Sequence, residues 1–103
     1  MIRHVVLFRF RDGVDWSDPR AVEAEAATAA HPAHIPEILH WEHGRNLNSR
    51  AAGYDFGLIG TFADLPAIDR YLSHPDHQAG VAAWQAIATW VVADIPAPAG
   101  AQA

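Results

Sequence analysis

The sequence predicts one α+β domain whose elements follow each other in the order strand, helix, strand, strand, helix, strand. Residues 2–11 and 54–62 alternate between two kinds of side chain with the period of two that is typical of a strand. Helix-start signals stand at Asp18-Pro19 and at Asp64, before the two stretches with helical spacing. Each element of this fold class can be justified in turn.

The first strand, residues 2–11, presents two different faces. Alternate side chains of a strand point to opposite sides of the sheet. One set is apolar except for its histidine and comprises Ile2, His4, Val6, Phe8 and Phe10. The other set is apolar only at its centre, at Val5 and Leu7, and ends in arginines. A face exposed to water would alternate more cleanly, so we expect both faces to be covered.

The first helix is predicted from Ser17-Asp18-Pro19 to about Ala30. The hydroxyl and the acid can cap the first turn, and proline suits its first positions. His31-Pro32 is expected to end the helix, because the residue before a proline avoids helical geometry. Val22 is the only large aliphatic side chain of this helix, which is otherwise rich in alanine.

The remaining elements follow from the same signals. A polar loop at residues 48–53 separates two strands, Asp64 caps the second helix, and Pro75 breaks that helix into two pieces. The predicted ranges are a strand at 38–47, a strand at 54–62, a helix from 64 to the break, a helical piece ending near Ala88, and a strand at 89–95. We therefore predict a single domain at 1–95 and a flexible tail at 96–103.

Composition limits the classes of function. The 103 residues carry a formal net charge of −5, which disfavours nucleic acid and an anionic membrane surface as partners. No apolar run approaches the roughly 18 residues of a membrane span, and the first residues lead directly into a strand pattern. The chain has no cysteine, which excludes disulfides and thiolate chemistry. We expect a cytoplasmic protein.

The order of elements is the split βαββαβ arrangement of ferredoxin-like domains. In such a domain the helices cover one face of the sheet. The apolar centre of the other face, with Val5, Leu7 and Ile59, then needs a different cover. We predict that a second copy supplies it, sheet against sheet, in a homodimeric α/β barrel.

The helix-covered face has two interpretations. The sheet offers several phenylalanines while the first helix offers mainly alanines, so the helix either packs closely on a filled core or leaves an apolar pocket for a small organic ligand. For the second case the expected lining is Val6, Phe8, Val22, Ala26, Leu58, Leu72, Val81 and Trp84.

The groups best placed for chemistry are His77, Tyr71 and His4. His77 lies in the first turn after the break, where the helix dipole disfavours the imidazolium, and a neutral imidazole can act as a general base. Tyr71 could then hold a carbonyl or enolate oxygen, and His4 could orient or share the proton. The alternative is structural: His74 and His77 cap helix ends, and His4 is a hydrogen-bonded core residue.

Metal and cofactor sites are not expected. The pairs His31/His34, His40/His43 and His74/His77 share a spacing of three. However, the prolines interrupt helical spacing in two pairs, and a strand sends the members of the third to opposite faces. The glycines at 57 and 60 lie in a strand rather than in a phosphate-binding turn.

The chain also resembles a known family. The segments that carry the resemblance are residues 1–8, Gly44-Arg45-Asn46, Gly53-Tyr54-Asp55 and Tyr71-Leu72-Ser73-His74-Pro75-Asp76-His77. Together they are similar to the Dabb family, the stress-responsive α/β-barrel domain, over residues 1 to about 95. The resemblance implies a dimeric α+β barrel of ferredoxin-like protomers.

For function, the resemblance implies two alternatives. Some plant members are non-catalytic stress-associated proteins, whereas one member is a polyketide cyclase that closes a ring by an aldol reaction without a cofactor. For that lyase-like activity, the resemblance implies His77 as the base, Tyr71 as its partner and His4 as the histidine on the first strand. This chain departs from the cyclase at Ala26-Ala27, where the cyclase carries a pocket tyrosine.

Overall fold

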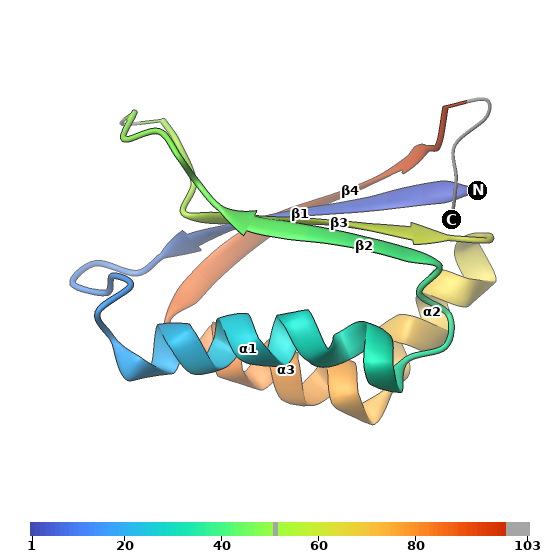
Figure 1. Cartoon of the computed structure of the whole chain (residues 1–103), viewed down its shortest axis with the longest axis horizontal. Helices are drawn as coiled ribbons and strands as arrows, with labels where there is room; N and C mark the ends of the chain where they lie inside the picture. The colour runs from blue at the N-terminus through green and yellow to red at the C-terminus, as the bar shows by residue number, and fades with distance from the viewer. Residues whose placement is uncertain (51, 99–103) are drawn as a thin grey trace.

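The computed structural model describes residues 1–50 and 52–98 and contains one four-stranded antiparallel sheet with all helices on one face (Figure 1). The strands lie in the order β2-β3-β1-β4. The elements are β1 (Ile2–Phe10), α1 (Pro19–His34), β2 (His40–Arg45), β3 (Phe56–Phe62), α2 (Leu65–Ser73), α3 (Pro75–Gln85) and β4 (Ala88–Pro96). The predicted ferredoxin-like α+β fold is thus confirmed.

The predicted helix starts are also confirmed. The carboxylates of Asp18 and Asp64 accept hydrogen bonds from backbone N–H groups in the first turns of α1 and α2, respectively. At the break before Pro75, the His74 side chain caps α3 by accepting a hydrogen bond of 3.1 Å from the N–H of Asp76. Each cap satisfies an N–H group that the helix itself leaves without a partner.

The predicted end of the first helix is wrong, because α1 continues through His31-Pro32 to His34. Proline has no N–H, so the carbonyl of Thr28, four residues earlier, loses its helical donor. The indole Nε1 of Trp41 donates a hydrogen bond of 3.1 Å to that carbonyl oxygen instead. A side chain from β2 therefore compensates for the proline, and sequence spacing within the helix does not reveal it.

Other boundaries differ by a few residues. β2 and β3 are shorter than predicted, and α3 ends at Gln85 because the chain turns there, with the N–H of Ile87 bonded to the carbonyl of Trp84. β4 extends to Pro96, opposite Ile2, so the sheet includes the first residue of the predicted tail. Residues 99–103 of that tail lie outside the described residues.

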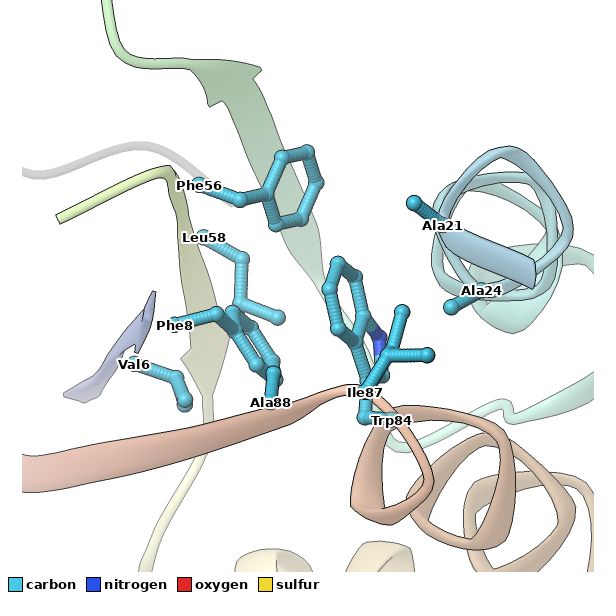
Figure 2. Close-up of a cluster of buried hydrophobic side chains, with 9 residues drawn as sticks. All are labelled: Val6, Phe8, Ala21, Ala24, Phe56, Leu58, Trp84, Ile87 and Ala88. Carbon is cyan, nitrogen blue, oxygen red and sulfur yellow. The ribbon is translucent and has the colours of Figure 1, made fainter. Parts of the chain in front are cut away.

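Trp84 fills much of the space between the small side chains of α1 and the aromatic side chains of the sheet (Figure 2). Its ring stacks on Phe8 at a centroid distance of 4.2 Å and on Phe56 at 5.3 Å. Ala21 and Ala24 approach from the other side. The mismatch between alanines and phenylalanines is thus resolved in part by a residue from α3.

The opposite face of the sheet is apolar at its centre and has no cover within the described residues (Figure 1). The strand register places Leu7 of β1 between Gly57 and Val91, and the next pair on the same face is Val5 with Ile59. Leu7 is 43% exposed and Val91 is 51% exposed. We refer to this surface of β1, β3 and β4 as the open face. No helix of the described residues is long and apolar enough to cross a membrane.

Candidate functional site

A cavity of about 190 Å³ lies between the sheet and the helices. Apolar and aromatic side chains form most of its wall, and imidazole, phenol and hydroxyl groups project into it. The lining residues are His4, Val6, Phe8, Thr28, His31, Leu58, Tyr71, Leu72, His77, Gly80, Val81, Trp84, Trp90, Val92 and Asp94. The helix-covered face of the sheet therefore contains both a filled core and a cavity.

Six of the eight residues expected to line the cavity do so: Val6, Phe8, Leu58, Leu72, Val81 and Trp84. Val22 and Ala26 do not, and both are exposed on the outer side of α1. The buried face of α1 consists of Ala21, Ala24, Thr28 and His31. The prediction that Val22 and Ala26 line the cavity was wrong, because the helical period of 3.6 residues turns both side chains away from this buried face.

His77 is half-buried in the cavity wall. Its Nδ1 lies 3.1 Å from the carbonyl oxygen of Leu72. A carbonyl only accepts hydrogen bonds, so Nδ1 carries the proton of the neutral ring and Nε2 keeps its lone pair. Burial lowers the pKa of His77, and the nearby imidazoles of His31 and His4 lower it further, whereas the Leu72 carbonyl and Asp76 oppose the shift. The ring is thus held in the form that can accept a proton.

Tyr71 lies beside His77, with ring centroids 4.3 Å apart. Tyr71 is 2% exposed. Burial raises the pKa of Tyr71, so the hydroxyl keeps its proton near neutral pH. No described residue bonds this hydroxyl, and no buried polar side-chain atom of the described residues lacks a partner; the hydroxyl is therefore open to the cavity.

His4 projects from β1 into the same cavity, as its position in the strand predicts. Its ring is 5.5 Å from that of Tyr71. Its Nδ1 lies 2.6 Å from Oδ1 of Asp94, the residue directly opposite on β4. The three residues predicted for chemistry thus share one cavity, and His4 is oriented by a carboxylate that the sequence analysis did not identify. The contacts of the structural alternative are present as well: His74 caps α3, His77 bonds a carbonyl in the last turn of α2, and His4 is a buried, hydrogen-bonded residue.

His31 is a further cavity residue that the sequence analysis missed. Its side chain is 4% exposed, and its Nδ1 lies 2.7 Å from Oδ2 of Asp76. This contact lowers the pKa of Asp76, which is therefore ionised near neutral pH. The helical phase of Ala21, Ala24 and Thr28 leads to His31, and this signal was hidden only because the helix was predicted to stop before it.

The histidine pairs do not assemble a metal site within the described residues, where no group of three potential ligands is close enough. His31 and His34 both approach Asp76, but His34 is 3.5 Å away and largely exposed. His40 is paired instead with Glu42 at 2.9 Å.

Chemically, the cavity combines a base, a hydrogen-bond donor and apolar walls. Nε2 of His77 can take a proton, and the Tyr71 hydroxyl can donate to an oxygen that becomes negative. No lysine or arginine of the described residues lines the cavity, so no permanently cationic side chain is available for a phosphate or carboxylate. The arrangement suits an uncharged organic molecule that carries a carbonyl group.

Comparisons with known proteins agree with this fold. Residues 2–97 match the Stress responsive A/B Barrel Domain family, Dabb. The uncharacterized protein SCO4036 of Streptomyces coelicolor is 45% identical over 94 residues, which cover 91% of this chain and 97% of that protein. A dimeric ferredoxin-like protein of unknown function from Thermobifida fusca has a TM-score of 0.81 and 29% identity, covering 93% of this chain and 90% of its own.

The same fold occurs in an enzyme. The hydroxynitrile lyase from Passiflora edulis superposes with a TM-score of 0.79 over 95% of this chain and 94% of its own, at 18% identity. At that identity the likeness shows the fold alone. The family match and the 45% identical relative go further: this chain is a member of the Dabb family of stress responsive A/B barrel domains.

Proposed function

We propose that this chain forms a cytoplasmic homodimer whose cavity binds a small, uncharged aromatic or polyketide-like molecule and removes a proton next to its carbonyl group. The observation that carries the proposal is that His77 and Tyr71 line the same cavity with their ring centroids 4.3 Å apart. The apolar wall supports a ligand of this kind, because it would bury the ligand's hydrophobic surface. The dimeric relative of known structure supports the homodimer.

In this proposal His77 is the general base. Its Nε2 takes the proton from the carbon next to the carbonyl; the C–H electron pair forms the C=C bond of an enolate, and the carbonyl π pair moves to oxygen. Tyr71 donates a hydrogen bond to that oxygen, and His4, held by Asp94, orients the groups. In an aldol-type ring closure the enolate carbon then bonds to a second carbonyl carbon of the same molecule. The oxygen of that second carbonyl becomes an alkoxide and takes the proton back from His77, while the first carbonyl re-forms.

The alternative, a non-catalytic stress or assembly protein, predicts a filled core beside His4 and Tyr71. The cavity that reaches both residues favours ligand binding over that alternative.

A polyketide-like substrate also needs enough space in the cavity, and a bulky side chain in the cavity wall would reduce that space. The exposed position of Ala26 means that this residue neither closes nor enlarges the cavity.

Proton abstraction can be tested without knowing the natural ligand. Acetophenone in D₂O exchanges its methyl protons for deuterium when a base forms the enolate, and ¹H NMR follows the loss of signal. We expect the protein to accelerate this exchange and His77→Ala to reduce the acceleration by about 10²-fold or more, because general base catalysis typically contributes that much. Tyr71→Phe should cost about 10²-fold through the lost oxyanion donor.

The matched control is His34→Ala, which removes an exposed imidazole of α1 outside the cavity and should leave the exchange rate unchanged. If His77→Ala retained the exchange rate within about tenfold, the base role would be wrong. If acetophenone bound but the wild-type protein caused no exchange, the protein would be a binding protein without this activity.

A further inference from the structure

We propose that His31 is a ligand-binding residue that accepts a hydrogen bond at Nε2, and that the ligand is therefore an uncharged aromatic compound with a hydroxyl group. This inference rests on the proposed function, since it names the chemical class that the cavity selects. It assigns a role to the pair His31 and Asp76, which the proton-abstraction step does not use.

The position of His31 is set by the close approach of α1 and α3. A Cβ at Gly80 would lie only 2.7 Å from Nε2 and 2.8 Å from Cε1 of His31, so only glycine leaves room for the ring. Gly80 is three residues after His77 on α3 and shares its helix face. The imidazoles of His31 and His77 consequently lie with their centroids 6.0 Å apart in the cavity wall.

The hydrogen bonds of the three cavity imidazoles determine what they offer to a ligand. Nδ1 of His4, of His31 and of His77 faces Asp94 Oδ1, Asp76 Oδ2 and the carbonyl oxygen of Leu72, respectively. Each of these partners is an acceptor, so Nδ1 carries the proton in each neutral ring. The remaining nitrogen, Nε2, is then an acceptor in all three rings.

Nε2 of His31 has no hydrogen-bond partner among the described residues. Every fully buried polar side-chain atom of those residues has a partner, so Nε2 is not fully buried. Nε2 lies beside Gly80, and since His31 lines the cavity we infer that the open part of this atom faces the cavity. An acceptor in an apolar cavity is costly to leave without a donor. A ligand that brings an O–H group satisfies this acceptor, whereas a ligand with only acceptor oxygens does not.

Two further features restrict the ligand. The cavity wall contains the aromatic side chains of Phe8, Trp84 and Trp90, which can contact an aromatic ring of a ligand edge to face. Asp94 and Asp76 supply negative charge near the imidazoles, and no described lysine or arginine lines the cavity, so an anionic ligand would meet no permanently cationic side chain. Together these features select a neutral hydroxylated aromatic compound rather than a carboxylate.

The test compares 4-ethylphenol with its methyl ether, 4-ethylanisole, which has the same ring but no donor. At pH 8, NMR titration of the wild-type protein should show the phenol binding at least tenfold more tightly. His31→Phe keeps a ring in place but removes Nε2, and we expect it to weaken phenol binding about five- to tenfold without changing binding of the ether. His34→Phe, on the same helix but outside the cavity, should change neither affinity.

A spectroscopic measurement on the wild-type protein does not depend on how the variants fold. Long-range ¹H–¹⁵N spectra should show His31 protonated at Nδ1 and not at Nε2, with the Nε2 signal shifted by the phenol and not by the ether. Equal affinity for the two compounds, or a proton at Nε2 of His31, would overturn the inference and leave the proposed function standing. Binding of neither compound would instead overturn the proposed binding of small aromatic molecules.

Discussion

Among single side chains, His77 best illustrates how the surroundings set chemistry. The ring faces Tyr71 from α2, His31 from α1 and His4 from β1, with Asp76 next to it on its own helix. Burial is the largest cause of its lowered pKa. The same burial that prepares the base for neutral pH also makes its protonation unfavourable for the folded state, which leads to a measurable effect on stability.

The stability of the protein should therefore rise with pH as His77 loses its proton. The unfolded chain protonates this histidine near pH 6.5, whereas the folded chain does so only at lower pH. Between these two pH values the unfolded state binds more protons, so the free energy of unfolding increases with pH. The contribution of His77 to this increase is complete above about pH 6.5. Urea unfolding at pH 5, 6 and 7, followed by tryptophan fluorescence at one protein concentration, measures this dependence.

His77→Gln is the matched variant, because it removes the titrating group and keeps a polar side chain. The increase in unfolding free energy from pH 5 to pH 7 should be smaller in this variant than in the wild type. An identical increase in both proteins would show that His77 does not titrate in the way its burial implies.

Among the helices, α1 depends on its neighbours for both of its unusual features. Its last turn contains Pro32, and its packing against α3 brings His31 against Gly80. The indole of Trp41, from β2, donates to the Thr28 carbonyl that Pro32 leaves without a donor. The geometry that places His31 in the cavity thus depends on a contact between a helix and an adjacent strand.

A double-mutant cycle can measure this compensation. Trp41→Phe leaves the Thr28 carbonyl without its indole donor and should lower the free energy of unfolding by about 1–3 kcal/mol. With Pro32→Ala present, the new N–H of residue 32 can bond to Thr28, so the same Trp41→Phe change should cost about 1 kcal/mol less. Urea unfolding of the four proteins gives the coupling energy, and strict additivity would contradict this compensation.

At the scale of the whole molecule, the open face is the apolar surface that no described residue covers. Its apolar centre lies along β1, β3 and β4, with a shallow groove of about 330 Å³ at Val5, Leu7 and Ile59. The cavity takes up the other side of the sheet. One layer of strands thus separates the proposed ligand site from the proposed dimer interface, so the two can be altered independently.

The proposed homodimer predicts a specific effect at Leu7. Leu7→Glu places a charge at the centre of the open face, which would be buried in the dimer without a partner, so the protein should become monomeric at micromolar concentration. Light scattering during size-exclusion chromatography measures the mass. Leu65→Glu is the control, because Leu65 is 58% exposed on α2; a monomeric wild-type protein would refute the homodimer.

Local sequence patterns were enough to define the order of the elements, the helix caps and the two faces of the sheet. Alternation in β1 correctly placed His4 on the helix-covered side, and the break at Pro75 correctly separated α2 from α3. These features depend on residues within one or two turns of each other. For the same reason the ferredoxin-like fold class could be predicted before any contact was known.

Partners distant in the chain required the folded structure. His4 meets Asp94 across 90 residues and His31 meets Asp76 across 45 residues. Trp41 allows α1 to continue past Pro32. Strand register and helix phase together decide which side chains meet, and no local period encodes the residue on the opposite element. Periodicity assigns a side chain to a face, whereas long-range packing selects its hydrogen-bonding partner and hence its chemistry.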